Sequence, residues 1–147
     1  MGMIDTTHKE ITKRRAIASA VIKMNRKAFS ALVKKASPKG DVLATAQVAG
    51  VLAAKNTPAI IPMCHPLELG KIEVQFQLDK KKNTVTTKVE VIYAGRTGVE
   101  MEAMVAAAAA SLTVYDMLKW ADRSMVVSEV KLLHKSGGKS GVYSRAQ

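Results

Sequence analysis

Strict alternation of apolar and polar residues predicts two neighbouring strands in the middle of the chain. Residues 72–78 and 85–91 alternate throughout, and the polar run Asp-Lys-Lys-Lys-Asn at 79–83 separates them. Successive side chains of a strand point to opposite faces of a sheet, and a short polar run between two alternating segments is typical of a turn. The sequence therefore predicts a β-hairpin over residues 72–91.

A similar alternation occurs near the N-terminus. Ala16, Ala18, Ala20, Ile22 and Met24 share one face if residues 14–24 form a strand. A helix is the competing interpretation because alanine is a good helix former, but the alternation favours the strand. Residues 126–133 are predicted to form the last strand.

Two helices are predicted between the first strand and the hairpin. The first is short, capped by Asn25, with Phe29, Leu32 and Val33 on its inner side. A loop at 37–40, Ser-Pro-Lys-Gly, follows it. The second helix is predicted to begin at Asp41 and to end near residue 55, with Val42, Ala46, Ala49 and Ala53 on its inner face.

The remaining segments complete the order of elements. Pro58, Pro62 and Pro66 predict a rigid, extended stretch after the second helix. A break at 95–98 precedes a long alanine-rich helix that ends near residue 121. Its 13-residue apolar run, 103–115, is shorter than the roughly 20 residues that cross a membrane, so we expect a buried helix and no membrane association.

This order of strand, helix, helix, hairpin, helix and strand predicts an α+β sandwich with an antiparallel sheet. The 147 residues show no internal repeat or linker. We therefore expect one domain over residues 1–147, with a flexible N-terminus (about 1–12) and a flexible C-terminal tail (about 136–147).

The charge balance points to an anionic partner. The net charge is +11, and residues 8–39 hold ten Lys/Arg against one acid, Glu10. A nucleic acid, a membrane surface and a phosphorylated small molecule all fit such a charge. Aromatic residues make up only 4% of the chain, which leaves few rings for base stacking. A basic nucleic-acid-binding module without catalysis remains the alternative on charge alone.

Cysteine and histidine usage limits the chemistry. Cys64 is the only cysteine, which excludes an internal disulfide and favours a reducing, cytoplasmic location. His65 follows it between two prolines and can exchange protons near neutral pH; a packed histidine is the alternative. His8 and His134 are the only other histidines, so no metal site is predicted.

The long helix carries the remaining candidates. Glu102 and Asp116 fall on one stripe but are 14 residues apart, roughly 21 Å along a straight helix. Two copies of the chain would have to pack together to bring both into one small site. Lys119 lies one turn beyond Asp116. The two side chains form either a surface ion pair or a partly buried, functional pair.

Two basic loops are further candidates. Lys39 lies just before a helix start, where it can help to hold an anion; a solvated lysine is the alternative. The Gly-Gly-Lys-Ser-Gly stretch at 137–141 lacks the spacing and the following helix of a phosphate loop. Its Lys139 is either a flexible finger onto phosphate or part of a frayed tail.

Taken together, these motifs resemble those of the cyclic pyranopterin monophosphate synthase family, over residues 3–141. The matching segments are Lys-Gly-Asp-Val at 39–42, Ala-Gly at 49–50, Ala-Ala-Lys at 53–55, Ile-Pro-Met-Cys-His-Pro-Leu at 61–67, Thr-Gly-Val-Glu-Met-Glu-Ala at 97–103, Tyr-Asp-Met at 115–117 and the glycine-rich stretch at 137–141. The second enzyme of molybdenum cofactor biosynthesis belongs to this family.

The resemblance implies a ferredoxin-like fold, with an antiparallel sheet and helices packed on one face. It also implies a hexamer, built as a trimer of dimers, with active sites at the dimer interfaces. The implied reaction turns a cyclised dihydro-GTP, (8S)-3′,8-cyclo-7,8-dihydroguanosine 5′-triphosphate, into cyclic pyranopterin monophosphate and pyrophosphate. No cofactor is implied.

The resemblance also assigns roles to individual residues. Asp116, Lys39 and Lys119 match catalytic positions. The substrate-binding positions are Met63, Cys64, His65, Met101, Glu102, Glu100, Arg14 and Lys139. Many relatives carry Arg at the positions of Gln47 and Asn56 and Cys at that of Leu118, so any contact made by those side chains is absent here.

Overall fold

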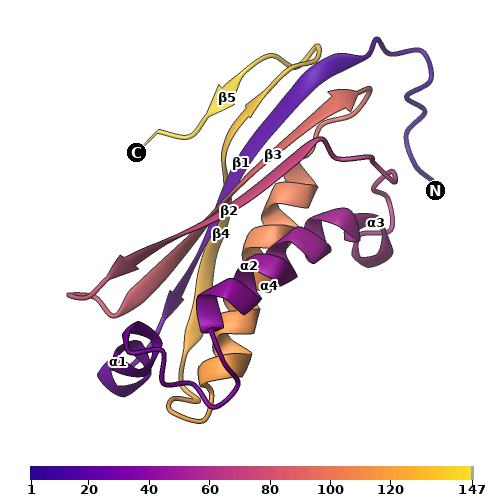
Figure 1. Ribbon diagram of the computed structural model, residues 1–147. Helices are drawn as coiled ribbons and strands as arrows, with labels where there is room; N and C mark the ends of the chain where they lie inside the picture. Colours follow the sequence, from indigo (N-terminus) through magenta and orange to yellow (C-terminus); the bar gives the residue numbers. More distant parts are fainter. Residues whose placement is uncertain (147) are drawn as a thin grey trace.

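The computed structural model describes residues 1–146 as a five-stranded antiparallel sheet with its long helices on one face (Figure 1). The strands are β1 (Thr12–Lys23), β2 (Lys71–Asp79), β3 (Thr84–Gly95), β4 (Val126–Ser136) and β5 (Tyr143–Ser144). The helices are α1 (Arg26–Val33), α2 (Val42–Lys55), α3 (Thr57–Ile60) and α4 (Glu100–Leu118). The predicted order of elements is confirmed, with α3 and β5 as additions.

The sheet has the order β2-β3-β1-β4-β5, and every neighbouring pair is antiparallel. β1 lies at the centre: its residues pair with β3 from Thr12↔Gly95 to Lys23↔Thr84, and its other edge pairs with β4. Two β-α-β units are thus interleaved, each split by a strand of the other. This arrangement confirms the α+β, ferredoxin-like fold.

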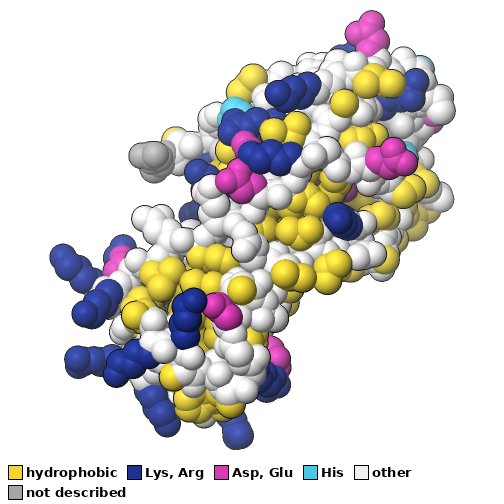
Figure 2. Space-filling model, viewed as in Figure 1, with side chains coloured by type: hydrophobic (Ala, Val, Ile, Leu, Met, Phe, Trp, Pro, Cys, Tyr) yellow, Lys and Arg dark blue, Asp and Glu magenta, His cyan; other side chains and the backbone are white. Residues whose placement is uncertain are grey.

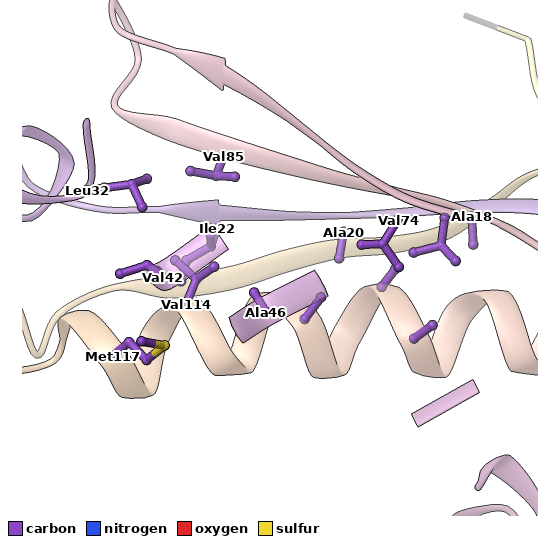
Figure 3. Packing of buried hydrophobic residues seen from close by; sticks show 14 of the residues in the cluster. Ala18, Ala20, Ile22, Leu32, Val42, Ala46, Val74, Val85, Val114 and Met117 are labelled. Carbon is purple, nitrogen blue, oxygen red and sulfur yellow. The ribbon is translucent and has the colours of Figure 1, made fainter. Parts of the chain in front are cut away.

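Alternation decides which face of the sheet the helices cover. Ala16, Ala18, Ala20 and Ile22 of β1 are fully buried on that face, as the sequence predicted. In Figure 3, Ile22 of β1 lies close to Val114 of α4 and Val42 of α2. The core is therefore a layer of small and β-branched side chains between the sheet and the helices.

α4 is the helix at the centre of this core. By length and composition alone it could cross a membrane, but half of it is buried inside the protein. The buried hydroxyls of Ser111 on α4 and Thr87 on β3 share a hydrogen bond of 3.1 Å. Because unpaired buried hydroxyls cost free energy, this bond favours one register of α4 on the sheet.

α2 lies beside α4 on the same face of the sheet (Figure 1). The predicted start is confirmed, because Asp41 caps α2 by accepting a hydrogen bond from the N–H of Ala44. The predicted inner face was partly wrong: Gly50 and Ala54 are buried where Ala49 and Ala53 were expected. Packing follows the ridge of residues four apart, which winds slowly around the helix.

α1 begins as predicted, with the Asn25 side chain accepting a hydrogen bond from the N–H of Ala28. Phe29 and Leu32 are buried, but Val33 is 57% exposed, contrary to expectation. Ala28 and Ala31 are buried instead. The buried face of α1 is therefore centred on these residues, and Val33, the last residue of the helix, lies outside that face.

Two other segments differ from the predictions. The proline-containing stretch is not extended throughout, because residues 57–60 form the short helix α3. Pro58 fits there, since the first turn of a helix needs no N–H donor at that position. The C-terminal tail contributes β5, in which Tyr143 and Ser144 pair with Lys135 and His134.

Lys and Arg side chains gather at the end of the molecule that holds α1 and the β2–β3 turn (Figure 2). We call this surface the basic end; it comprises Lys23, Arg26, Lys27, Lys34, Lys80, Lys81 and Lys82. A hydrogen bond from the N–H of Met24 to the carbonyl of Asn83 joins the two segments. The uneven charge seen in the sequence is therefore partly concentrated at one end.

Candidate active site

A basic cleft lies at the opposite end of β1, where that strand and α4 begin. Its volume is about 780 Å³. The lining residues, which define the basic cleft, are His8, Lys9, Glu10, Thr12, Arg14, Arg15, Arg96, Thr97, Gly98, Val99, Glu100 and residues 135–140. Six Lys/Arg against two Glu make the cleft a suitable place for a polyanion.

Arg14 forms the floor of the basic cleft. Its side chain is buried and donates from Nε to the carbonyl of Gly95 at 3.1 Å. The tail crosses over it at Gly137 and Gly138, whose φ values of +93° and +77° favour glycine. A Cβ at Gly138 would lie 1.6 Å from Nη1 of Arg14. The glycine pair thus allows Lys139 and Arg14 to share the cleft.

Glu100 is the acid at the start of α4 that faces this cleft. Lys135 of β4 places its Nζ 3.1 Å from Oε1 of Glu100 and donates a second contact to Oγ of Ser140 at 2.6 Å. The structure therefore brings together three predicted substrate-binding residues, Arg14, Glu100 and Lys139. It adds Lys135, which the sequence analysis missed.

Glu102, two residues after Glu100 on α4, lies in a different environment. It is 3% exposed, and burial raises the pKa of its carboxyl group, with the charge of Glu100 adding to this shift. Burial also raises the pKa of the Cys64 thiol, and the charge of Glu102 acts in the same direction. The predicted Cys64 segment and the start of α4 are therefore neighbours.

The other predicted residues of this region are more accessible. Met63 is 47% exposed, whereas His65 and Met101 are partly buried. None of these three lines the basic cleft. The predicted substrate-binding residues thus form two adjoining groups at one end of α4.

The three predicted catalytic residues meet at the other end of α4. Asp116 accepts hydrogen bonds from Nζ of Lys39 at 2.6 Å and from Nζ of Lys119 at 2.8 Å, one lysine on each carboxylate oxygen. We call Lys39, Asp116 and Lys119 the lysine–aspartate cluster. Each side chain is about half exposed, because the buried stripe of α4 faces the sheet on the other side of the helix.

Local structure brings Lys39 to this position from 77 residues away. Oγ of Ser37 donates to the carbonyl of Met117 at 3.0 Å and accepts from the N–H of Lys39. Gly40 ends the loop with a φ of +99°, a left-handed conformation that suits glycine. The 37–40 loop is therefore attached to the end of α4.

The two lysines control the charge of the aspartate. The hydrogen bond from Lys119, followed by that from Lys39, lowers the pKa of Asp116 to about 2. In return, the hydrogen bond to Asp116 raises the pKa of Lys119. The lysine–aspartate cluster therefore presents two cations and one carboxylate to any molecule that binds on this surface of α4.

The two ends of α4 do not meet within one chain. α4 is unbroken from Glu100 to Leu118, so Glu102 and Asp116 are roughly 21 Å apart along its axis. The basic cleft and the lysine–aspartate cluster are consequently separate surfaces in this chain.

The residues that depart from the family pattern lie outside both surfaces. Gln47 donates from Nε2 to the carbonyl of Val74, and Asn56 donates from Nδ2 to that of Leu52. Leu118 is fully buried in the core. None of the three lines the basic cleft or takes part in the lysine–aspartate cluster.

Arg96 and Lys135 are the main cleft residues that the sequence analysis did not select. Arg96 lies in the break that comes directly before the Thr-Gly-Val-Glu-Met-Glu-Ala motif, and Lys135 precedes the tail. Both residues lie next to segments that the sequence analysis had selected as candidates for substrate binding. That position was the signal that could have identified them. Among residues 1–146, no group of three or more His, Cys, Asp or Glu could hold a metal ion.

Comparison with known proteins gives one consistent result. Residues 3–138 match the model of the MoaC family. A relative from Staphylococcus carnosus (strain TM300) is 52% identical over 144 residues, covering 97% of this chain and 89% of its own length. One from Thermoanaerobacter sp. (strain X514) is 48% identical over 143 residues, covering 97% and 90%. Both are named cyclic pyranopterin monophosphate synthase. The chain therefore belongs to the MoaC family.

Proposed function

We propose that this chain is a lyase of molybdenum cofactor biosynthesis that converts (8S)-3′,8-cyclo-7,8-dihydroguanosine 5′-triphosphate to cyclic pyranopterin monophosphate and pyrophosphate. Its relatives carry the name of that enzyme. The observation that carries the proposal is the lysine–aspartate cluster, in which Lys39 and Lys119 are both bound to Asp116.

Charge supports the binding of a triphosphate. When a ribose hydroxyl attacks the α-phosphorus, a P–O bond forms, the bond to pyrophosphate breaks, and negative charge grows on the leaving group. Cations that are already in place stabilise that charge. The basic cleft offers Arg14, Lys135 and Lys139 for this purpose, and the lysine–aspartate cluster offers two more lysines.

Proton transfer is the second requirement, because one ring opens and another closes. A carboxylate with a pKa of about 2 is a weak base near neutral pH. Phosphate oxygens that draw Lys39 or Lys119 away would remove the hydrogen bonds that lower this pKa. In the proposed mechanism Asp116 therefore becomes a better base only when substrate is bound, and the lysines serve phosphate and proton transfer together.

We further propose that the active site is shared between two copies of the chain, within a hexamer that is a trimer of dimers. The separation of roughly 21 Å between Glu102 and Asp116 supports this proposal, since one small substrate cannot reach both ends of one α4. A two-fold dimer would place the substrate-binding end of one copy beside the lysine–aspartate cluster of the other.

Turnover is tested directly. The protein is incubated with the cyclised dihydro-GTP, and both pyrophosphate and the fluorescent pterin formed on oxidation are measured. Stoichiometric release of both supports the function. Release of neither by a folded, oligomeric protein overturns it, and DNA binding that weakens steeply with salt would then favour the nucleic-acid alternative.

The shared site is tested by mixing two inactive variants, Asp116→Asn and Glu102→Gln. In a hybrid dimer with shared sites, one of the two sites contains no altered residue. Equal amounts reassembled together should therefore regain about a quarter of the wild-type turnover. No recovery in verified hybrids would show that each chain holds a complete site.

The proposed setting is the cytoplasm, where the lone Cys64 stays reduced. We propose that residues 1–147 act as a single domain.

A further inference from the structure

The basic end differs from the other charged surfaces because its cations lack acidic partners. Within residues 1–146, six of its seven Lys and Arg side chains form no ion pair, and Lys82 lies 4.0 Å from Asp79. By contrast, Lys71 on the body of the sheet lies 2.6 Å from Glu73. All seven cations of the basic end are exposed. Their positive charge is therefore scarcely neutralised by the protein itself.

The stability of the fold does not account for this charge. Arg26 and Lys27 occupy the first two positions of α1, where the positive end of the helix dipole disfavours cations. Lys80 and Lys81 lie in the β2–β3 turn at the same end of the molecule. Like charges gathered in one place repel one another and destabilise the folded state. The charge of the basic end is therefore expected to serve an interaction.

The basic end adjoins the lysine–aspartate cluster. Trp120 directly follows Lys119 in the chain, and Nζ of Lys27 lies 6.0 Å from the centroid of the Trp120 ring. The N–H of Asn25, the cap of α1, donates to Oδ2 of Asp122 at 2.7 Å. α1 and the last turn of α4 thus lie together at one end of the molecule (Figure 1). The field of the basic end consequently extends over the surface that carries the cluster.

The shape of the basic end suits attraction at a distance. Its Lys and Arg side chains project in several directions (Figure 2), and none of them lines the basic cleft. A small ligand in a fixed pose needs converging polar groups, which side chains that point apart do not supply. An electrostatic field needs no such convergence, since it reaches about 30 Å at an ionic strength of 0.01 M.

We propose that the basic end steers the polyanionic substrate toward the lysine–aspartate cluster and so speeds its capture without contacting it once bound. The identity of that anion, a nucleoside-triphosphate derivative, rests on the proposed function, whereas the field rests on the unpaired cations. Steering of this kind raises association rates by about 10- to 10³-fold and weakens steeply as salt is added.

Two variants of the β2–β3 hairpin with the same change in net charge test the proposal. The tip variant carries Lys80→Gln and Lys81→Gln, in the turn of the basic end. The strand variant carries Lys71→Gln and Lys88→Gln, on β2 and β3, and is the matched control. The tip variant should have a Tm equal to or above that of the wild type, because it loses only unpaired like charges.

Trp120 reports the field without any need for turnover, because it is the only tryptophan and is 47% exposed. Iodide, an anion, and acrylamide, a neutral molecule, are the quenchers, at low and fixed ionic strength. The ratio of iodide to acrylamide quenching should fall about 1.5-fold to threefold in the tip variant, and much less in the strand variant. Equal ratios in the tip variant and the wild type would overturn the field.

Turnover of the cyclised dihydro-GTP tests the steering itself. At an ionic strength of about 0.01 M the tip variant should lose roughly twofold to fivefold in kcat/KM with kcat unchanged, and adding Arg26→Gln should enlarge the loss. A single change such as Lys34→Ala should cost less than about twofold, since the field sums over many charges. The strand variant should stay close to the wild type.

Salt separates steering from direct contact. Near 1 M ionic strength, where charges are screened beyond about 3 Å, the tip variant and the wild type should have the same kcat/KM. A deficit that persists at 1 M, or no deficit at 0.01 M, would overturn steering. If the wild type turns over and kcat/KM ignores the tip variant, only this proposal fails. If the wild type shows no turnover, the proposed function fails, and steering of this substrate fails with it.

Discussion

The two ends of α4 show how one helix can give two acids opposite properties. Glu102 and Asp116 lie on the same stripe of the helix, yet Glu102 is buried and Asp116 is half exposed. Burial raises the pKa of Glu102, whereas hydrogen bonds from Lys119 and Lys39 lower that of Asp116 to about 2. Position on the helix therefore does not set the pKa of these two acids; burial and the charged side chains around each one do.

This difference indicates that the two ends of α4 have different tasks. The Glu102 end combines a poorly hydrated acid with an adjoining basic cleft, which suits recognition of a ring and a phosphate chain. The Asp116 end holds a carboxylate whose two partners are themselves attracted by phosphate.

Asp116→Asn should reduce turnover by about 10²-fold or more, the scale of general acid–base catalysis, with the fold and assembly retained. Lys119→Ala should lose a similar amount, and the double variant should be little worse than either one, since residues that act as a unit are not additive. Steady-state kinetics and light scattering measure both properties.

The matched control for this pair is Glu129 with Lys131, an ion pair of 2.6 Å on β4. Glu129→Gln and Lys131→Ala should leave turnover unchanged. Near-wild-type rates in Asp116→Asn or Lys119→Ala would remove the catalytic role from the Asp116 end.

Lys39→Ala should lose most of the turnover, about tenfold or more, with almost no change in Tm. Lys39 donates from Nζ to the carboxylate and to the carbonyl of Asp116 and is about half exposed, so little packing depends on it. Lys34→Ala, at an exposed position of the basic end, is the control. A large fall in Tm with normal activity per folded molecule would mean that Lys39 is structural.

The carboxyl groups of Glu102 and Asp116 should have widely different pKa values. Glu102 should take up its proton above its ordinary pKa of 4.5, and Asp116 should stay ionised until the pH approaches about 2. NMR titration with carbon-labelled Glu and Asp measures both groups in one sample. Lys119→Ala should move the Asp116 titration upward and leave that of Glu102 in place; coincident titrations of the two groups would remove the contrast.

The smallest expected effect is on stability. A raised folded-state pKa means that Glu102 costs stability once pH rises above 4.5, where the unfolded chain ionises first. Glu102→Gln should therefore gain stability relative to the wild type between pH 4 and neutral pH, and match it below about pH 4. Urea denaturation across this range measures the gain. A loss that grows with pH would mean that ionised Glu102 has a stabilising partner.

Much of the fold could be predicted because its signals are local. The alternation in β1 and in the hairpin, and the caps Asn25 and Asp41, depend only on neighbouring residues. The Val33 error has the opposite origin, since which face of a short helix is buried depends on its packing against distant segments. β5 could not be predicted because a two-residue strand carries no pattern and exists only through pairing with β4.

The candidate site was predictable in part. Asp116 and Lys119 are one turn apart, so helical geometry alone brings them together. Lys39 reaches them from a loop 77 residues away, and only the resemblance to a known family placed it among the catalytic residues. Arg96 and Lys135 also line the basic cleft, and their places beside the chosen segments were the only sequence signal for them.

The position of β1 has a consequence for how this protein becomes active during its synthesis. β1 is made early but pairs with β3 and with β4, and the basic cleft is lined by residues 8–10 before β1 as well as by residues 135–140. At about 5–20 residues per second, a ribosome takes roughly 5–25 s to travel from β1 to β4. Throughout that interval the nascent chain carries an exposed central strand and half a cleft. The basic cleft can therefore form only after residues 135–140 have left the ribosome.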